Sequence, residues 1–379
     1  MALSGASRPV PRIEARRGAR GSLLVVAAFL AVLTLFLAYA DSSFNGYRLQ
    51  LVTLVAINAT VAVSLTMTNG FTGVFSLGQV GFLAIGAYVG TLLSLAPQWK
   101  QDTFLPGLPG WLAELDTSGW PDQVALLFAC VVGGLVAAAV ASIVGAPLMR
   151  LSGHYVAVAT MGFLIIVQAV AVNWSGVTRG ARGLSQIPTY TNVWAAYGWA
   201  IITVYVAWRI RNSPYGRAMI ASRENLIAAR AVGVNVLRSR LLSFVVGAFF
   251  TGAAGSLLAH QIGTVAPKAY YFTTTFTIII MVVLGGLGSV SGAVVGATIM
   301  TLAPEYLRGI EDGFSLGPID VGEAFGLSQI ILAVAFILVM IFRPQGLFGD
   351  RELSLRWPRV GARRGPAIEP AGSSPTDAR

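Results

Sequence analysis

The chain has few charged residues. Only 11% of its 379 residues are Asp, Glu, Lys or Arg, whereas an ordinary soluble domain carries about a quarter. Hydrophobic residues make up 55%, and the mean hydropathy is +0.71. The charges lie at the two ends and in short segments between long apolar runs, and about 20 apolar residues are enough to cross a bilayer. This distribution excludes a soluble protein and predicts an all-α polytopic membrane protein.

Cysteine and histidine are also scarce. The single cysteine, Cys130, excludes a disulfide within the chain. The two histidines, His154 and His260, lie far apart in the sequence, and a metal site needs more ligands than they supply. No pair of carboxylates and no Ser/His/Asp set falls at a common depth. We therefore expect no metal, no cofactor, no catalytic residue and no enzymatic activity.

Lysine occurs only twice. Neither Lys100 nor Lys268 stands in the Gly-x-x-x-x-Gly-Lys-Ser/Thr pattern that holds nucleotide phosphates. The chain is therefore not expected to hydrolyse ATP itself. If ATP drives its activity, the motor must be a separate chain.

Long apolar runs dominate what remains, and glycines interrupt several of them. Around Gly70–Gly81 and Gly285–Gly288 the interruptions fall inside apolar stretches. Non-helical backbone at membrane depth persists only where protein or a water-filled cavity surrounds it, so we expect re-entrant or broken helices there. We predict about ten transmembrane helices, at 21–40, 49–68, 78–95, 124–148, 153–171, 193–208, 241–260, 272–287, 289–307 and 324–342.

The basic residues give an orientation, because cytoplasmic loops carry an excess of Lys and Arg. A cytoplasmic N-terminus with ten spans places 20 of the 26 basic residues inside. They flank spans, so the net charge of +10 reflects topology and no nucleic-acid partner is expected. We predict an inner-membrane protein with both termini cytoplasmic, comprising a basic N-terminus at 1–20, a transmembrane domain at 21–348 with a cytoplasmic loop at 209–240, and a disordered tail at 349–379. The first apolar run is longer than that of a signal peptide, so an uncleaved first span is expected.

The loop at 209–240 contains its own helix signals. Ser222 can cap a helix start, the run Asn225–Val232 is compatible with a helix, and Gly233 supplies a stop. Such a short helix, predicted over Arg223–Val232, is not stable alone and needs a docking partner. The alternative is a basic loop facing lipid headgroups, which the seven arginines of this loop also satisfy.

Motifs along most of the chain resemble the LivM-type permeases, the membrane subunits of ATP-binding-cassette importers for branched-chain amino acids. The motifs are Asn69-Gly70-Phe71-Thr72-Gly73, Ser76-Leu77-Gly78-Gln79, Ser213-Pro214-Tyr215-Gly216-Arg217-Ala218, Leu284-Gly285-Gly286-Leu287-Gly288-Ser289 and Phe342-Arg343-Pro344-Gln345-Gly346-Leu347. The resemblance implies an ABC importer permease fold. It also implies a second homologous permease, two ATPase subunits, a periplasmic or extracellular solute-binding protein and contact with membrane lipid.

The same resemblance implies that the 209–240 loop is the counterpart of the coupling helix that enters a groove of the ATPase. Small residues would allow close approach, and Arg223 and Glu224 would form charge-assisted bonds across the contact. The residues expected to couple the permease to the ATPase are Arg223, Glu224, Asn225, Ala228, Ala229 and Gly233.

A polar, glycine-containing stretch at Ser76–Tyr88 is a candidate for the solute pathway. Ser76, Gln79 and Tyr88 offer hydrogen bonds, and Phe82 can pack against an aliphatic side chain. The alternative is helix–helix packing, for which glycine, serine and glutamine are also typical in lipid. The residues leave both interpretations open.

The pathway half departs from the family pattern. Gly153-His154-Tyr155 replaces the usual Gly-Asp-Tyr, and the family's Thr-Gly-Gly-Pro-x-Gly-Leu loop reads Thr178-Arg179-Gly180-Ala181-Arg182-Gly183-Leu184. The solute therefore stays open: branched-chain or other hydrophobic amino acids, or urea and short amides. An ion-coupled secondary carrier is a further alternative, although the spans are almost free of the charges that such carriers use for coupling.

Overall fold

The computed structural model describes residues 13–102, 107–117, 119–151, 153–311, 314–316, 319–321 and 326–349. The predicted tail beyond Gly349, the first twelve residues of the predicted N-terminal segment and the first two residues of the predicted last span (324–325) lie outside these residues. The chain divides into two units, Met1–Ala38 with Leu353–Arg379, and Tyr39–Glu352. Most of the first helix belongs to the first unit, and the remaining elements belong to the second.

The described residues are mostly helical. The α-helices are α1 (Ile13–Ser43), α2 (Gly46–Leu65), α3 (Gln79–Ser94), α4 (Pro97–Asp102), α5 (Gly110–Ala113), α6 (Asp122–Leu148), α7 (His154–Asn173), α8 (Ser175–Thr178), α9 (Val193–Arg211), α10 (Pro214–Glu224), α11 (Leu226–Ala231), α12 (Val236–Ile262), α13 (Phe272–Gly285), α14 (Val290–Glu311) and α15 (Leu327–Phe342). The π-helix η1 (Thr66–Phe71) extends α2, and the short 3₁₀ helices are η2 (Gly180–Arg182) and η3 (Pro267–Ala269).

Each of the ten predicted spans coincides with one of these helices, and the all-α prediction is confirmed. Among the described residues, seven helices are long and apolar enough to cross a membrane, and three shorter apolar helices lie at Ala27–Ser43, Gln79–Ser94 and Leu327–Phe342. The described strands form two small antiparallel pairs. These are β1 (Leu184–Ser185) with β2 (Thr264–Val265), and β3 (Phe314–Leu316) with β4 (Ile319–Val321).

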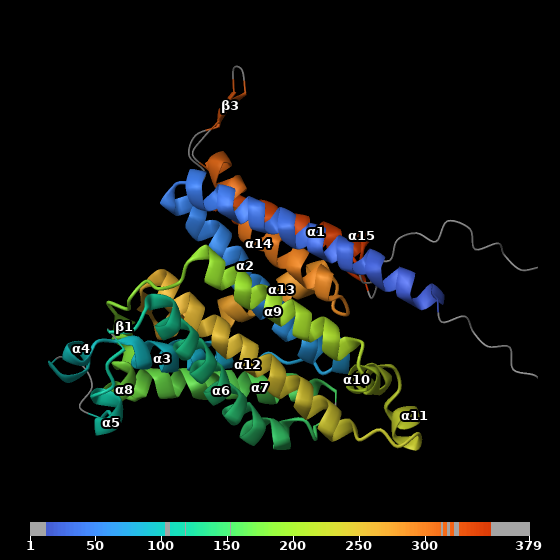
Figure 1. Ribbon diagram of the computed structural model, residues 1–379, viewed down its shortest axis with the longest axis horizontal. Helices are drawn as coiled ribbons and strands as arrows, with labels where there is room; N and C mark the ends of the chain where they lie inside the picture. The colour runs from blue at the N-terminus through green and yellow to red at the C-terminus, as the bar shows by residue number, and fades with distance from the viewer. Residues whose placement is uncertain are drawn as a thin grey trace, which may run out of the picture. The chain divides into compact units, whose positions relative to one another are not determined.

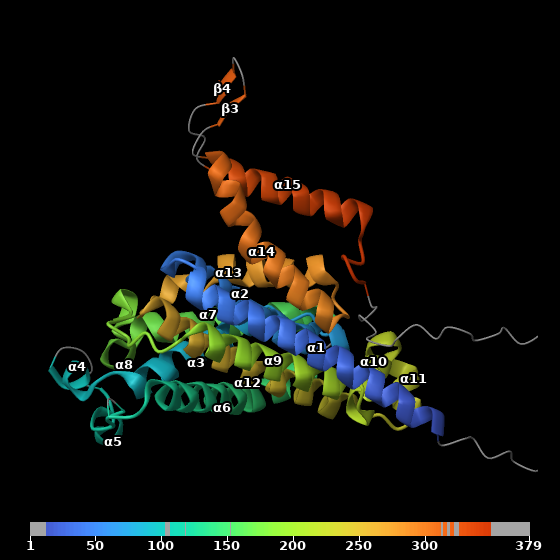
Figure 2. The same ribbon diagram turned by 45° about the horizontal axis from the view of Figure 1, so that its top comes forward.

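Within the larger unit, the connections between helices gather at two ends of the bundle. Figures 1 and 2 show α10 and α11 at one end, and α4, α5 and α8 at the other. We call the first the basic end, because its loop carries seven arginines between Arg209 and Arg240. The second is called the opposite end.

The core is built around α12, which packs against both α3 and α6. Small residues let these helices approach closely: a Cβ on Gly86 would overlap the Gly252 carbonyl, and one on Gly255 would overlap the Leu83 carbonyl. The Ser256 hydroxyl donates to the Gly86 carbonyl at 2.8 Å and thereby ties α12 to α3. This packing fixes α3, the helix that carries most of the candidate pathway residues.

The predicted helix interruptions are present, and both adjoin α10 at the basic end. Helix α2 continues into η1, and residues 73–78 then run without regular helix to the start of α3. The α2–α3 break comprises η1 and this segment. Asn69 holds this α2–α3 break, because its Oδ1 accepts from the Ser76 amide at 3.0 Å and its Nδ2 donates to the Ser76 carbonyl at 3.4 Å. The Thr160 hydroxyl of α7 accepts from the Leu77 amide at 2.9 Å. Side chains therefore satisfy backbone groups of the break, and protein buries part of it, although Gly73 and Phe75 are exposed.

The second interruption, the α13–α14 break at residues 286–289, contacts the first. A Cβ on Gly70 would overlap the Leu287 carbonyl oxygen, so the two breaks touch backbone to backbone. The turn at 343–349, which follows α15, completes the contact: the amides of Leu347 and Phe348 donate to the Leu284 and Gly285 carbonyls at 2.9 and 3.1 Å. We call the two breaks and this turn the glycine hub.

At the opposite end, a buried lysine organises the connection between α3 and α6. Lys100 is only 1% exposed, and its Nζ donates to the carbonyls of Leu112 and Leu115 at 3.2 and 2.9 Å. Burial lowers the pKa of Lys100 from 10.5 to about 8, and the nearby Asp116 opposes part of this shift.

This pKa predicts that the connection becomes more stable as the pH rises from about 8 to 10.5. In that window the unfolded segment binds a proton that the folded one has released, so unfolding becomes less favourable with increasing pH. Chymotryptic cleavage at the exposed Trp111 should slow by at most about tenfold per pH unit relative to a Lys100→Met variant. Identical pH profiles for the two proteins would contradict the role of Lys100.

Candidate functional site

Helix α10 begins directly after α9 at the basic end. The Ser213 hydroxyl accepts from the Gly216 amide at 3.2 Å, and Pro214 occupies the first helical position, where it needs no hydrogen-bond donor. A Cβ on Gly216 would overlap the Ile210 carbonyl, so the turn between the two helices is tight. These local signals fix the direction in which α10 leaves α9.

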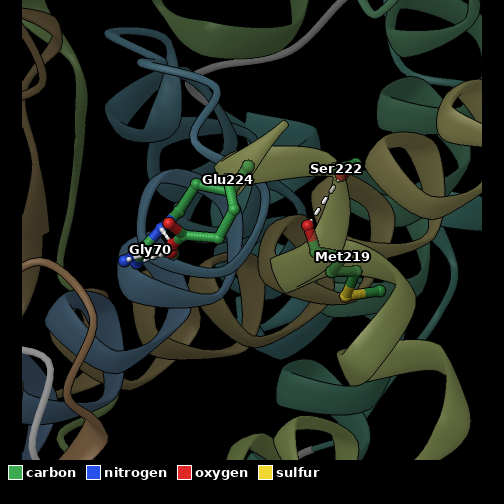
Figure 3. Close-up of polar contacts among 5 residues, drawn as sticks. Gly70, Met219, Ser222 and Glu224 are labelled. Atoms are coloured by element: carbon green, nitrogen blue, oxygen red, sulfur yellow. Dashed lines mark hydrogen bonds and ion pairs between the residues drawn. The ribbon is translucent and has the colours of Figure 1, made fainter. Parts of the chain in front are cut away.

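The sequence prediction of a single helix capped by Ser222 and running over Arg223–Val232 is wrong. Helix α10 continues through Glu224, and the Ser222 hydroxyl donates to the Met219 carbonyl at 2.7 Å (Figure 3). Asn225 takes an extended conformation (φ −150°, ψ 108°), and its Oδ1 accepts from the amides of Ile227 and Ala228 at 3.0 Å. Asn225 therefore ends α10 and caps α11, because its side-chain oxygen accepts from backbone N–H groups that have no partner within the first turn of a helix.

Helix α11 and its C-cap residue Val232 present two large apolar side chains to solvent. Ile227 is 81% exposed and Val232 is 78% exposed, whereas Ala229 is buried on the inner side. Gly233 has φ +85°, a conformation that favours glycine and ends the helix. No atom lies within 4 Å of the position of an added Cβ, so the backbone conformation and not a close contact requires the glycine. Sequence reasoning missed Ile227 and Val232. The available signal was a pair of large apolar residues in a loop that is otherwise basic.

Arg223 points into the protein. Its Nη1 donates to the Gly70 carbonyl at 2.7 Å, and its Nη2 lies 3.2 Å from Glu224 Oε1. Figure 3 shows Glu224 beside Gly70 at this contact. The Arg223 stem packs on Gly73, whose φ is +68° and whose Cβ, if present, would lie 2.7 Å from Arg223 Cγ. Arg223 therefore joins α10 to the first break.

Two cavities adjoin this arginine. The larger, of about 360 Å³, lies among the α2–α3 break, the end of α13 and the 343–349 turn. The smaller, of about 150 Å³, lies between η1 and α10. Both are lined by Arg223, so the contact between α10 and the hub borders two cavities.

The four candidate pathway residues face different neighbours. Gln79 donates to the Thr251 hydroxyl and, at 3.3 Å, to the Gly247 carbonyl, both on α12. Phe82 packs between the rings of Phe163 and Phe244, with centroids 4.9 and 5.2 Å away. Gln79 and Phe82 thus make helix–helix contacts within the core.

Ser76 and Tyr88 differ from this pair. Ser76 lies in the α2–α3 break, where its hydroxyl accepts from the Gly78 amide at 3.4 Å. Tyr88 is buried farther along α3, and within the described part of the chain its hydroxyl has no hydrogen-bond partner. The Gln79 Oε1 likewise has none there. Thr91 Oγ1 is the third such atom, so three buried polar atoms on α3 lack a hydrogen-bond partner within the described residues and can bind water or a solute.

The sequence comparisons place this architecture in a family. Residues 47–342 match the family described as branched-chain amino acid transport system / permease component. This chain belongs to that family of transport permeases. It is a multi-pass membrane protein, and the prediction of a LivM-type permease is confirmed.

Two curated relatives of the permease cover most of it. The high-affinity branched-chain amino acid transport system permease protein LivM of Escherichia coli is 30% identical over 363 residues, covering 86% of this chain and 76% of the relative. The corresponding LivH protein of Escherichia coli is 26% identical over 344 residues, covering 84% and 98%. The autoinducer 2 import system permease protein LsrC of Klebsiella pneumoniae is 31% identical over only 157 residues, or 38% of this chain. No solved structure matches the chain.

One departure of this permease from the LivM pattern has a conformational cost. Arg179 stands where the family pattern has a glycine, and its φ is +64°. This left-handed conformation costs a non-glycine residue roughly 1 kcal/mol. Partial burial and the neighbouring Arg182 lower the pKa of Arg179. The permease thus keeps a charged side chain at the opposite end despite backbone strain.

Proposed function

We propose that this permease forms the solute pathway of an ATP-driven importer for branched-chain or other hydrophobic amino acids, and that α10 and α11 dock onto a separate ATPase chain. The observation that supports the docking is the exposure of two large apolar side chains, Ile227 on α11 and Val232 at its C-cap. The helix is capped at both ends. A capped helix of six residues with an apolar outer side matches the recognition of a short helix by a groove.

The partners follow from the same proposal. The relatives LivM and LivH are both permease proteins of high-affinity branched-chain amino acid systems. We infer that this chain pairs with a second homologous permease, two ATPase subunits and a solute-binding protein. The basic end then faces the cytoplasm, as the positive-inside rule favours, and both termini lie on that side of the inner membrane.

Uptake in cells that lack the chromosomal copy and carry a plasmid copy tests this proposal. Radiolabelled leucine should accumulate, isoleucine and valine should compete, and urea should not. Arsenate, which depletes ATP, should stop the uptake, whereas a protonophore added while ATP is maintained should not. Uptake that survives arsenate but collapses with the membrane potential would instead identify a secondary carrier.

A further inference from the structure

The Arg223 side chain bonds the end of α10 to the glycine hub. Helix α10 lies on the chain between α9 and α11, while η1 is the last turn of α2, about 150 residues earlier. Arg223 spans this separation with its 2.7 Å bond to the Gly70 carbonyl. The Arg223 side chain is only 24% exposed.

The Gly70 carbonyl is chemically suited to receive this bond. It belongs to the last turn before the chain leaves the helix, where carbonyls lose their intrahelical partners. The helix dipole makes this terminus electronegative and favours a cation there. A guanidinium satisfies both demands, and a hydrogen bond from a charged donor is stronger than one from a neutral donor.

The geometry around the bond is adapted to the arginine. Gly73 leaves room for its stem, and Gly70 in turn contacts the Leu287 carbonyl of the second break. The Oδ1 of Asn69, the neighbour of Gly70, accepts from the Ser76 amide and so fixes the segment that leads into α3. A displacement of Arg223 therefore acts on α2, on the start of α3 and on the α13–α14 break together.

We propose that Arg223 is a positioning residue that transmits movement of α10 and α11 to the α2–α3 break and the glycine hub. This inference rests on the docking proposed above, because the movement would originate at the ATPase. Arg223 thus acts inward, on the backbone of its own chain, and not across the contact with the ATPase as its sequence context suggested. The two cavities beside it provide the space for the shift.

Hydrogen–deuterium exchange on the complex purified with its ATPase tests this role. Exchange of residues 66–78 and 225–234 is followed without nucleotide and after trapping with ATP and vanadate. In the wild type, both segments should change their exchange rate at least twofold. In Arg223→Ala, the response of 225–234 should persist, while the response of 66–78 should fall to less than a quarter of the wild-type value.

Two further variants control the experiment. Arg217→Ala removes an arginine of α10 whose one side-chain hydrogen bond within the described residues is local, to the Asn212 carbonyl at 3.2 Å, and should behave as the wild type. Arg223→Lys keeps a cationic donor and should recover part of the response at 66–78. It also serves as the test variant if Arg223→Ala does not fold.

The outcomes separate the two proposals. If 66–78 responds fully in Arg223→Ala, the relay is wrong while the docking stands. The same holds if 225–234 responds in the wild type and 66–78 does not. If neither segment responds in the wild type, docking onto the ATPase is wrong, and the relay that depends on it is wrong as well.

Discussion

Replacing Ile227 by aspartate should separate the permease from its ATPase and leave the membrane domain folded. Ile227 projects from α11 with 81% of its surface exposed, and Asn225 caps the helix independently of that side chain. A carboxylate pressed into an apolar groove loses its hydration without gaining a partner. Loss of a central anchor costs an interface about 2 kcal/mol or more, which lowers affinity roughly thirtyfold.

Co-purification of the ATPase with the tagged permease measures this effect, and leucine uptake should fall in parallel. Ile262→Asp is the matched control, because Ile262 is an exposed isoleucine at the C-terminal end of α12. It should leave the amount of bound ATPase unchanged. Normal co-purification of the Ile227→Asp variant would show that α11 is not the docking element.

Replacing Gly70 by alanine should disrupt the glycine hub. The new Cβ would overlap the Leu287 carbonyl oxygen, which belongs to the backbone of the second break and cannot rotate away. Overpacking of this kind costs about 3 kcal/mol. The midpoint of thermal unfolding in detergent should therefore fall by roughly 5 °C.

The single thiol provides the measurement for this variant. Cys130 is buried in α6, so its reaction with a maleimide reports loss of tertiary packing. Gly162→Ala is the control, because Gly162 has no atom within 4 Å of its missing Cβ. Its midpoint should match the wild type. Equal midpoints for the two variants would mean that the two breaks do not touch as described.

The apolar segments and their interruptions were predictable from the sequence because both follow from short-range composition. A run of about 20 apolar residues suffices to identify a span. The clusters around Gly70 and Gly285 identified the breaks, although which breaks contact each other was not predictable. That contact joins residues more than two hundred positions apart through backbone atoms, which leave no complementary side-chain pattern in the sequence.

The candidate site was predicted less well, for physical reasons that differ between residues. Ser222 and Asn225 are both good helix caps, and only the tertiary fold decides that Asn225 takes the extended conformation. Arg223 was selected from the sequence for a bond across the contact with the ATPase, but a long side chain in a basic loop gives no sign of its direction, and the structure shows it bonded to the Gly70 carbonyl. Its carbonyl partner carries no charge, so no search for an opposite charge would find it.

The glycine contacts have a genetic consequence. At Gly81 an added Cβ would meet the Phe163 ring at 2.9 Å, so a second mutation that shortens residue 163 can restore the fit. At Gly70, Gly285 and Gly292 the obstructing atom is a backbone carbonyl, which no codon change removes. Intragenic suppressors of defects at these three positions should therefore be far rarer than suppressors of a defect at Gly81.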